Sequence, residues 1–271
     1  MDSLSATTLS EAIPLTGVWD HLRHRRQTAF IPYLTAGFPD RGASLEALRL
    51  AAVVGDILEV GVPFSDPLAD GPVIQRSSFR ALERGMTLAG TLDLVARLGS
   101  SRPVVLFSYL NPVLRYGVTR LLADAAAAGV SGLLLTDLPA GGDPGVEAAI
   151  AASRLDPIRL VAPTSSAARI TEAVRGARGF IYLIGRLGVT GTGAAPDADL
   201  GLSVARVRAA TGLPVAVGFG ISTAEQARAV AQAADGVVVG SALVAALGQH
   251  GVVGLERLLG TLRGALDREA A

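Results

Sequence analysis

The chain has 271 residues, of which half are hydrophobic, and a mean hydropathy of +0.44. This length exceeds the ~100–200 residues usual for one domain, but it suits an α/β barrel, which takes ~200–250 residues as a single unit. The 24 basic and 24 acidic side chains cancel to a formal net charge of +0. Such a balance excludes the basic footprint of a nucleic-acid-binding protein.

Two missing residue types exclude whole classes of mechanism. All 24 basic residues are arginine, so no lysine can form a Schiff base with a substrate or with pyridoxal phosphate, or complete a Walker-type phosphate loop. The chain has no cysteine, which excludes disulfides, thiol nucleophiles and thiolate metal sites. Its three histidines, His21, His24 and His250, have neither the spacing nor the setting of metal ligands, and we expect no metal.

The sequence predicts neither export nor membrane insertion. Residues 1–10 hold an acid and no basic region ahead of an apolar run, which argues against a secretory signal. No apolar stretch reaches the ~20 residues that a membrane helix needs. We therefore expect a cytoplasmic protein.

Eight short apolar runs rich in β-branched residues alternate with helical segments along the chain. A helix is predicted at residues 18–26, ahead of the first run. The runs are residues 29–34, 57–60, 104–107, 132–135, 158–161, 180–184, 215–217 and 237–239. Helical periodicity lies between them, for instance at residues 44–54, 88–98, 119–128, 167–175, 204–211 and 224–234.

Continuous rather than alternating apolar runs indicate strands that are covered on both faces, as in parallel sheets. Eight βα units predict an α/β fold of the (β/α)8 TIM barrel type, with an additional N-terminal helix and one domain spanning residues 1–271. An open doubly wound sheet stays possible, because strand order cannot be read from one sequence. In a barrel, the active site lies where the strands end and the βα loops begin.

The second strand contains an acid, Glu59, inside an otherwise apolar run. Burial there would raise its pKa toward neutrality, which suits a group that both accepts and donates a proton. A buried acid paired with an arginine is the alternative. The following loop, residues 61–72, holds Asp66 and Asp70 among prolines and glycines that restrict their directions, although Asp-Pro and Asp-Gly also occur in ordinary turns.

Three later strand ends complete the predicted site. Tyr182 lies on the sixth strand, ahead of a glycine-dense loop at residues 185–193 that is long enough to close over a site. The seventh strand leads into glycines at residues 218–222, and the eighth into Gly240 and Ser241 directly before a helix. Backbone amides at such positions bind phosphate in many barrels.

The segment EVGVPFSDPLADGP at residues 59–72 closely resembles the signature of the tryptophan synthase α subunit. The resemblance continues in family order through PYLTAG at 32–37, NP at 111–112, TDLP at 136–139, GVTG at 188–191, GFGI at 218–221 and GS at 240–241. It implies a carbon–carbon lyase of tryptophan biosynthesis that cleaves indole-3-glycerol phosphate into indole and glyceraldehyde 3-phosphate. It also implies a β-subunit partner in an α2β2 heterotetramer, which holds pyridoxal phosphate and receives the indole, so that this chain itself needs no cofactor.

The resemblance assigns roles to individual residues. It implies that Glu59 is the proton donor to indole C3 and the base at the glycerol hydroxyl, that Asp70 accepts from the indole N–H, and that Tyr182 positions the two acids. The other implied roles are phosphate binding by Gly191, Gly220, Gly240 and Ser241, an indole slot of Tyr33, Phe107, Leu134 and Phe219, and a partner interface that includes Asp66, Asn111 and Pro139.

Three other functions stay open at this point. A scaffold subunit without activity would keep the partner face but lose the acids, and both acids are present. A sugar-phosphate isomerase or epimerase often needs a lysine or metal-binding histidines at the strand ends, which this chain does not supply. A lyase that releases free indole without a partner would have the same acids.

Overall fold

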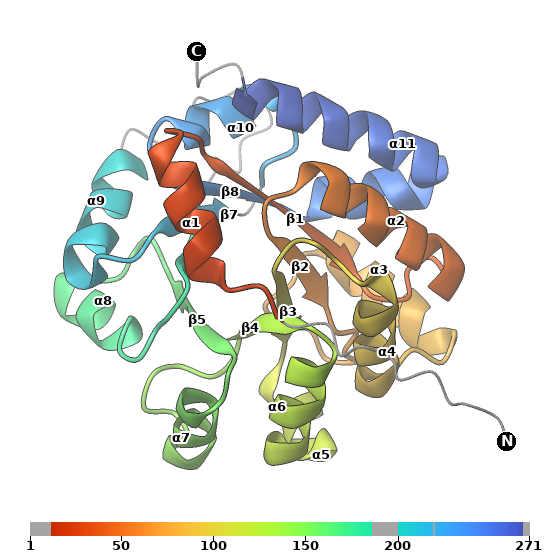
Figure 1. Ribbon diagram of the computed structural model, residues 1–271, viewed down its shortest axis with the longest axis horizontal. Coiled ribbons are helices and arrows are strands. Elements are labelled where there is room, and N and C mark those ends of the chain that lie inside the picture. Colours follow the sequence, from red (N-terminus) through yellow and green to blue (C-terminus); the bar gives the residue numbers. More distant parts are fainter. Residues whose placement is uncertain (1–11, 186–199, 219, 268–271) are drawn as a thin grey trace, which may run out of the picture.

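The computed structural model describes residues 12–185, 200–218 and 220–267. Eight parallel strands form a closed barrel in which the strands follow one another in sequence order and β8 pairs with β1 (Figure 1). They are β1 Ala29–Thr35, β2 Leu58–Gly61, β3 Val104–Ser108, β4 Val130–Leu135, β5 Asp156–Val161, β6 Ile181–Ile184, β7 Val215–Gly218 and β8 Gly236–Val239. The predicted barrel is confirmed, and the open sheet is excluded.

Helices surround the strands on the outside of the barrel, except α1, which lies across one of its ends (Figure 1). They are α1 Leu15–His24, α2 Arg41–Val54, α3 Pro72–Glu83, α4 Leu88–Leu98, α5 Leu110–Tyr116, α6 Val118–Ala127, α7 Pro144–Ala152, α8 Ala167–Ala173, α9 Leu200–Thr211, α10 Ala224–Ala231 and α11 Ser241–Asp267. Helix α11 is broken at Gly251, whose φ of 64° lies outside the helical region. The additional N-terminal helix is confirmed, although it begins at Leu15 rather than at residue 18.

Apolar side chains form two clusters, one between strands and helices and a smaller one inside the barrel. Helix α1 closes the inner cluster at the amino ends of the strands, where Trp19 packs against Phe180 with ring centroids 5.5 Å apart. Side chains alternate between the two faces of a strand. Since Leu58 and Val60 of β2 pack in the outer cluster, Glu59 between them points into the barrel.

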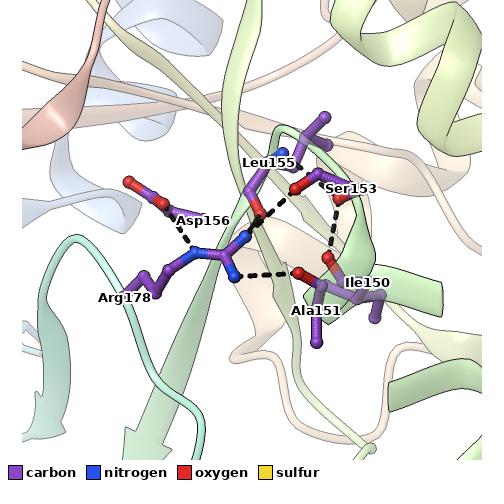
Figure 2. A network of polar contacts seen from close by, with 6 residues as sticks. All are labelled: Ile150, Ala151, Ser153, Leu155, Asp156 and Arg178. Carbon is purple, nitrogen blue, oxygen red and sulfur yellow. Dashed lines mark hydrogen bonds and ion pairs between the residues drawn. The ribbon is translucent and has the colours of Figure 1, made fainter. Parts of the chain in front are cut away.

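Arginine clamps join the loops at the amino ends of the strands. The guanidinium of Arg178 pairs with Asp156, the first residue of β5, at 3.0 Å, and it also donates to the backbone carbonyls of Ala151, Ser153 and Leu155 (Figure 2). A second clamp joins Arg263 of α11 to Asp56, at 2.8 Å, and the same carboxylate accepts from the amide of Phe30. These contacts fix the end of the barrel that lies opposite the predicted site.

Candidate active site

A cleft opens at the carboxyl ends of the strands and holds about 660 Å³ of atom-free space, its open mouth included. The residues that line it come from β1, β2, β3, β6 and β8, from the loops that follow β2, β7 and β8, and from the first turns of α3 and α11. They are Tyr33, Glu59, Asp70, Gly71, Ile74, Phe107, Tyr182, Gly220, Ile221, Ser222, Val238, Gly240, Ser241 and Ala242.

Glu59 is a buried carboxyl group at the floor of the cleft, with only 1% of its surface exposed. Its Oε1 atom has no hydrogen-bond partner in the part of the chain that the structure describes. Burial raises the pKa of Glu59 to about 8, because the charged form loses its hydration. Glu59 is therefore mostly a neutral acid at pH 7, poised to donate a proton into the cleft.

Asp70 is the second acid of the cleft, and its surroundings differ from those of Glu59. Burial raises the pKa of Asp70 to about 6, while a hydrogen bond from the hydroxyl of Tyr109 opposes that rise. The hydroxyl donates to Oδ2 of Asp70 over 3.0 Å. At pH 7 Asp70 is thus mostly ionised while Glu59 is mostly protonated. Two carboxyl groups with separated pKa values are the pattern expected of an acid and an electrostatic partner in one site.

Two tyrosine hydroxyls flank the acids, and each lies against a glycine of the neighbouring strand. A Cβ atom at Gly61 would overlap the hydroxyl of Tyr33, and one at Gly218 would overlap that of Tyr182. Burial raises the pKa of Tyr33 and that of Tyr182 well above the ordinary value of a tyrosine, so both hydroxyls stay protonated. The ring of Tyr33 also meets that of Phe107 edge to face, with centroids 5.3 Å apart, which forms an aromatic wall.

A second part of the cleft wall is made of glycines and of the start of a helix, and its Gly240 lies against Tyr33. Gly220 has a φ of 75°, which favours glycine, and it lies two residues after the end of β7. Gly240 precedes Ser241, the first residue of α11, and all three residues line the cleft. The first backbone amides of α11 have no partner within the helix, and the start of a helix carries a partial positive charge. This wall is therefore suitable for binding an anion.

Comparisons with known proteins agree with this geometry. A family model described as "Tryptophan synthase alpha chain" matches residues 19–259. The chain belongs to the tryptophan synthase alpha chain family. A family member from Geobacter sulfurreducens is 46% identical over 259 residues, which cover 94% of this chain and 98% of that protein. One from Caulobacter vibrioides is 48% identical over 227 residues, or 82% of each chain.

Solved structures of the family have the same fold. A chain of Mycobacterium tuberculosis tryptophan synthase superposes with a TM-score of 0.86 at 42% identity, covering 94% of this chain and 99% of its own. The tryptophan synthase subunit alpha from Legionella pneumophila superposes with a TM-score of 0.85 at 33% identity, covering 95% of this chain and all of its own. The resemblance on which the sequence predictions rest is thus confirmed.

Most of the residues to which the family resemblance assigns a role lie together. Eight of the eleven cleft residues predicted from sequence line the cleft, namely Glu59, Asp70, Tyr182, Gly220, Gly240, Ser241, Tyr33 and Phe107. Leu134 does not line it, because the side chain is fully buried in the cluster inside the barrel. Gly191 and Phe219 lie outside the described residues.

The predicted partner residues lie outside the cleft. Asp66, Asn111 and Pro139 are all exposed, on loops or helix starts that follow β2, β3 and β4. Near them, Leu68 is a large apolar side chain with 92% of its surface exposed. The three loops therefore present polar and apolar groups at the same end of the barrel as the cleft.

Tyr109 is a site residue that the sequence reading missed. It follows the third strand directly and precedes the Asn-Pro pair of the family pattern, so its position at a strand end was available as a signal. Among the described residues no group of three or more potential ligands is arranged to hold a metal ion. No helix in the same part of the chain has the length and apolar character needed to cross a membrane.

Proposed function

We propose that this chain cleaves indole-3-glycerol phosphate into indole and glyceraldehyde 3-phosphate, as a lyase that works by proton transfer between carboxyl groups and substrate. The observation that carries the proposal is the pair of acids that line one cleft, Glu59 and Asp70, and burial raises the pKa of Glu59 further than that of Asp70. Membership of the tryptophan synthase alpha chain family supports the choice of substrate.

Glu59 supplies the proton that starts the reaction. The neutral carboxyl group transfers its proton to C3 of the indole ring, which becomes a cation with a weakened bond between C3 and the glycerol chain. As that bond breaks, its electron pair restores the aromatic ring. The adjacent glycerol carbon becomes an aldehyde, and its hydroxyl proton passes to the Glu59 carboxylate, which regenerates the acid.

Asp70 stabilises the charge that forms in this step. Protonation at C3 places positive charge on the ring nitrogen, and an ionised Asp70 that accepts from the N–H lowers the energy of that intermediate. Tyr33 and Phe107 form the aromatic wall against which the ring packs. Tyr182 lines the same cleft with a buried neutral hydroxyl, and the family resemblance gives it a role in positioning the acids.

The phosphate group binds at the wall of the cleft that is made of glycines and the start of α11. Gly220, Gly240 and Ser241 present backbone amides there, and the start of α11 adds its partial positive charge. Since the chain has no lysine, these donors replace the ammonium group that phosphate sites often contain. Gly191 and Phe219, which the family resemblance adds to the phosphate site and the indole slot, belong to the same proposal.

The family also implies a β-subunit partner, and we propose an α2β2 heterotetramer in which the β subunit holds pyridoxal phosphate. Asp66, Asn111 and Pro139 form the contact surface on this chain, and the exposed Leu68 adds an apolar anchor. Because this surface lies at the cleft end of the barrel, indole released from the cleft would reach the partner directly.

The test is indole release from indole-3-glycerol phosphate by the purified chain, with and without a tryptophan synthase β subunit. We expect weak release that the partner raises strongly, with loss of release in Glu59→Gln and loss of most of it in Asp70→Asn. Glu225→Gln, which changes an exposed glutamate of α10 in the same way, is the matched control. Full activity without the partner would favour a free-standing lyase, whereas an active Glu59→Gln variant would refute the assignment of the acid.

A further inference from the structure

Tyr109 contacts the loop between β2 and α3 at three points. Its hydroxyl donates to Oδ2 of Asp70 over 3.0 Å and accepts from the amide of Ala69, also over 3.0 Å. Its ring packs on Phe64 with centroids 5.1 Å apart. Tyr109 itself is buried, whereas Phe64 and Asp70 are half-buried and Ala69 is exposed.

The backbone around Tyr109 is fixed by neighbours outside that loop. Tyr109 is the N-cap residue of α5, and its carbonyl accepts from Oγ of Ser108 over 3.1 Å. The amide of the next residue, Leu110, donates to Oδ1 of Asp137 over 2.7 Å. The tyrosine therefore links the end of β3 and the loop after β4 to the acid of the β2–α3 loop.

Other contacts hold the backbone of Asp70 but leave its carboxylate free. The amide of Asp70 donates to the carbonyl of Pro67, and the Gln75 side chain donates to the carbonyl of Asp70 over 2.9 Å. Within the described residues, the Tyr109 hydroxyl is the one hydrogen-bond donor to the Asp70 carboxylate. Rotation of this carboxylate is thus restrained by a single group.

We propose that Tyr109 is a positioning residue for the reaction, which holds the carboxyl group of Asp70 oriented toward the indole ring nitrogen. The inference rests on the proposed function. Because the Ala69 amide fills one acceptor site of the hydroxyl, the single O–H proton is directed at Asp70. The second oxygen of the carboxylate then stays available to the substrate.

The charge balance around Asp70 makes this role measurable. The Tyr109 hydrogen bond favours the ionised form and keeps the pKa of Asp70 at about 6 in spite of burial. The other ionisable groups that face Asp70 are Glu59, Tyr33 and Tyr182, whose pKa values all lie at about 8 or above, so they carry little charge at pH 6. Loss of the Tyr109 hydroxyl should therefore raise the pKa of Asp70.

The experiment compares the pH profiles of kcat/KM for indole release by the wild-type chain, Tyr109→Phe and Tyr116→Phe, each with the β subunit. Tyr116→Phe is a matched control, because the hydroxyl of Tyr116 also donates to an aspartate, Asp124, over 2.6 Å, but outside the cleft. We expect Tyr109→Phe to lower kcat/KM at pH 7 about tenfold or more. We also expect the acid limb, which begins near pH 6, to move to higher pH, while the control matches the wild type.

A double variant tells a positioning role from a merely structural one. If Tyr109 acts through Asp70, Tyr109→Phe should cause little further loss in an Asp70→Asn background. An unmoved acid limb, or an equal loss in both backgrounds, would overturn the inference and leave the proposed function intact. Full activity of Asp70→Asn alone would instead refute the role of Asp70, and both proposals with it.

Discussion

The buried acid of the cleft should make the protein less stable as the pH rises, and Glu59→Gln should remove that effect. The pKa of Glu59 is about 8 in the folded chain and about 4.5 when the side chain is solvated. Between these values the folded state holds a proton that the unfolded state has released. The free energy of unfolding therefore falls with pH, by about 1.4 kcal/mol per pH unit.

The total loss reaches at most about 5 kcal/mol by pH 8, which is 3.5 pKa units at 1.36 kcal/mol each. Glutamine has nearly the same shape and carries no charge at any pH. The two chains should thus be similarly stable near pH 4.5, and the variant should become increasingly the more stable one toward pH 8.

The assay is urea unfolding of the wild-type chain and Glu59→Gln at pH 5, 6.5 and 8, with the difference in unfolding free energy plotted against pH. Other ionisable groups contribute alike to both chains and cancel in the difference. A difference that stays constant across this range would show that Glu59 is ionised at neutral pH. The reasoning that makes it the proton donor would then fail.

Three further predictions concern the cleft and the barrel. The profile of kcat/KM against pH should be bell-shaped, with an acid limb near pH 6 from Asp70 and a basic limb near pH 8 from Glu59; limbs at other positions would contradict these assignments. Gly61→Ala should displace the hydroxyl of Tyr33, and Gly218→Ala that of Tyr182, so each should lower the rate of indole release with little change in circular dichroism. An unaffected rate would show that the position of that hydroxyl is unimportant for the reaction. Arg178→Ala should lower the free energy of unfolding by about 2 kcal/mol, because it removes the clamp at the amino ends of the strands, and it should leave kcat at 25 °C unchanged. A reduced kcat in the fully folded variant would show that this clamp and the cleft are not independent.

The strands were predictable because they are buried on both faces. All eight apolar runs correspond to strands, and most boundaries agree within two residues. Their polar ends were harder to place, as at β5, which begins at Asp156 rather than at residue 158. Helix α3 was not predicted, because its segment is rich in polar residues and directly follows the loop that the motif had marked as a site.

The acids of the site were predictable, but the contacts between them and their neighbours were not. An acid such as Glu59 inside an apolar strand breaks the pattern and stands out in the sequence. The bond between Tyr109 and Asp70 joins residues 39 apart, so only the closed barrel brings them together. Leu134 pairs in register with Phe107, yet only Phe107 lines the cleft, because strand alternation gives the direction of a side chain and not its depth in the barrel.

The position of Trp19 determines what fluorescence can report about this protein. It is the only tryptophan in the chain, and it packs against Phe180 beneath the strands, at the end of the barrel away from the cleft. Its emission should therefore follow the detachment of α1 and the loss of the inner core during unfolding. Binding events at the cleft should leave it nearly unchanged. Since the proposed substrate and product both carry an indole ring, any change of emission during turnover would come from them, above a steady signal from the protein.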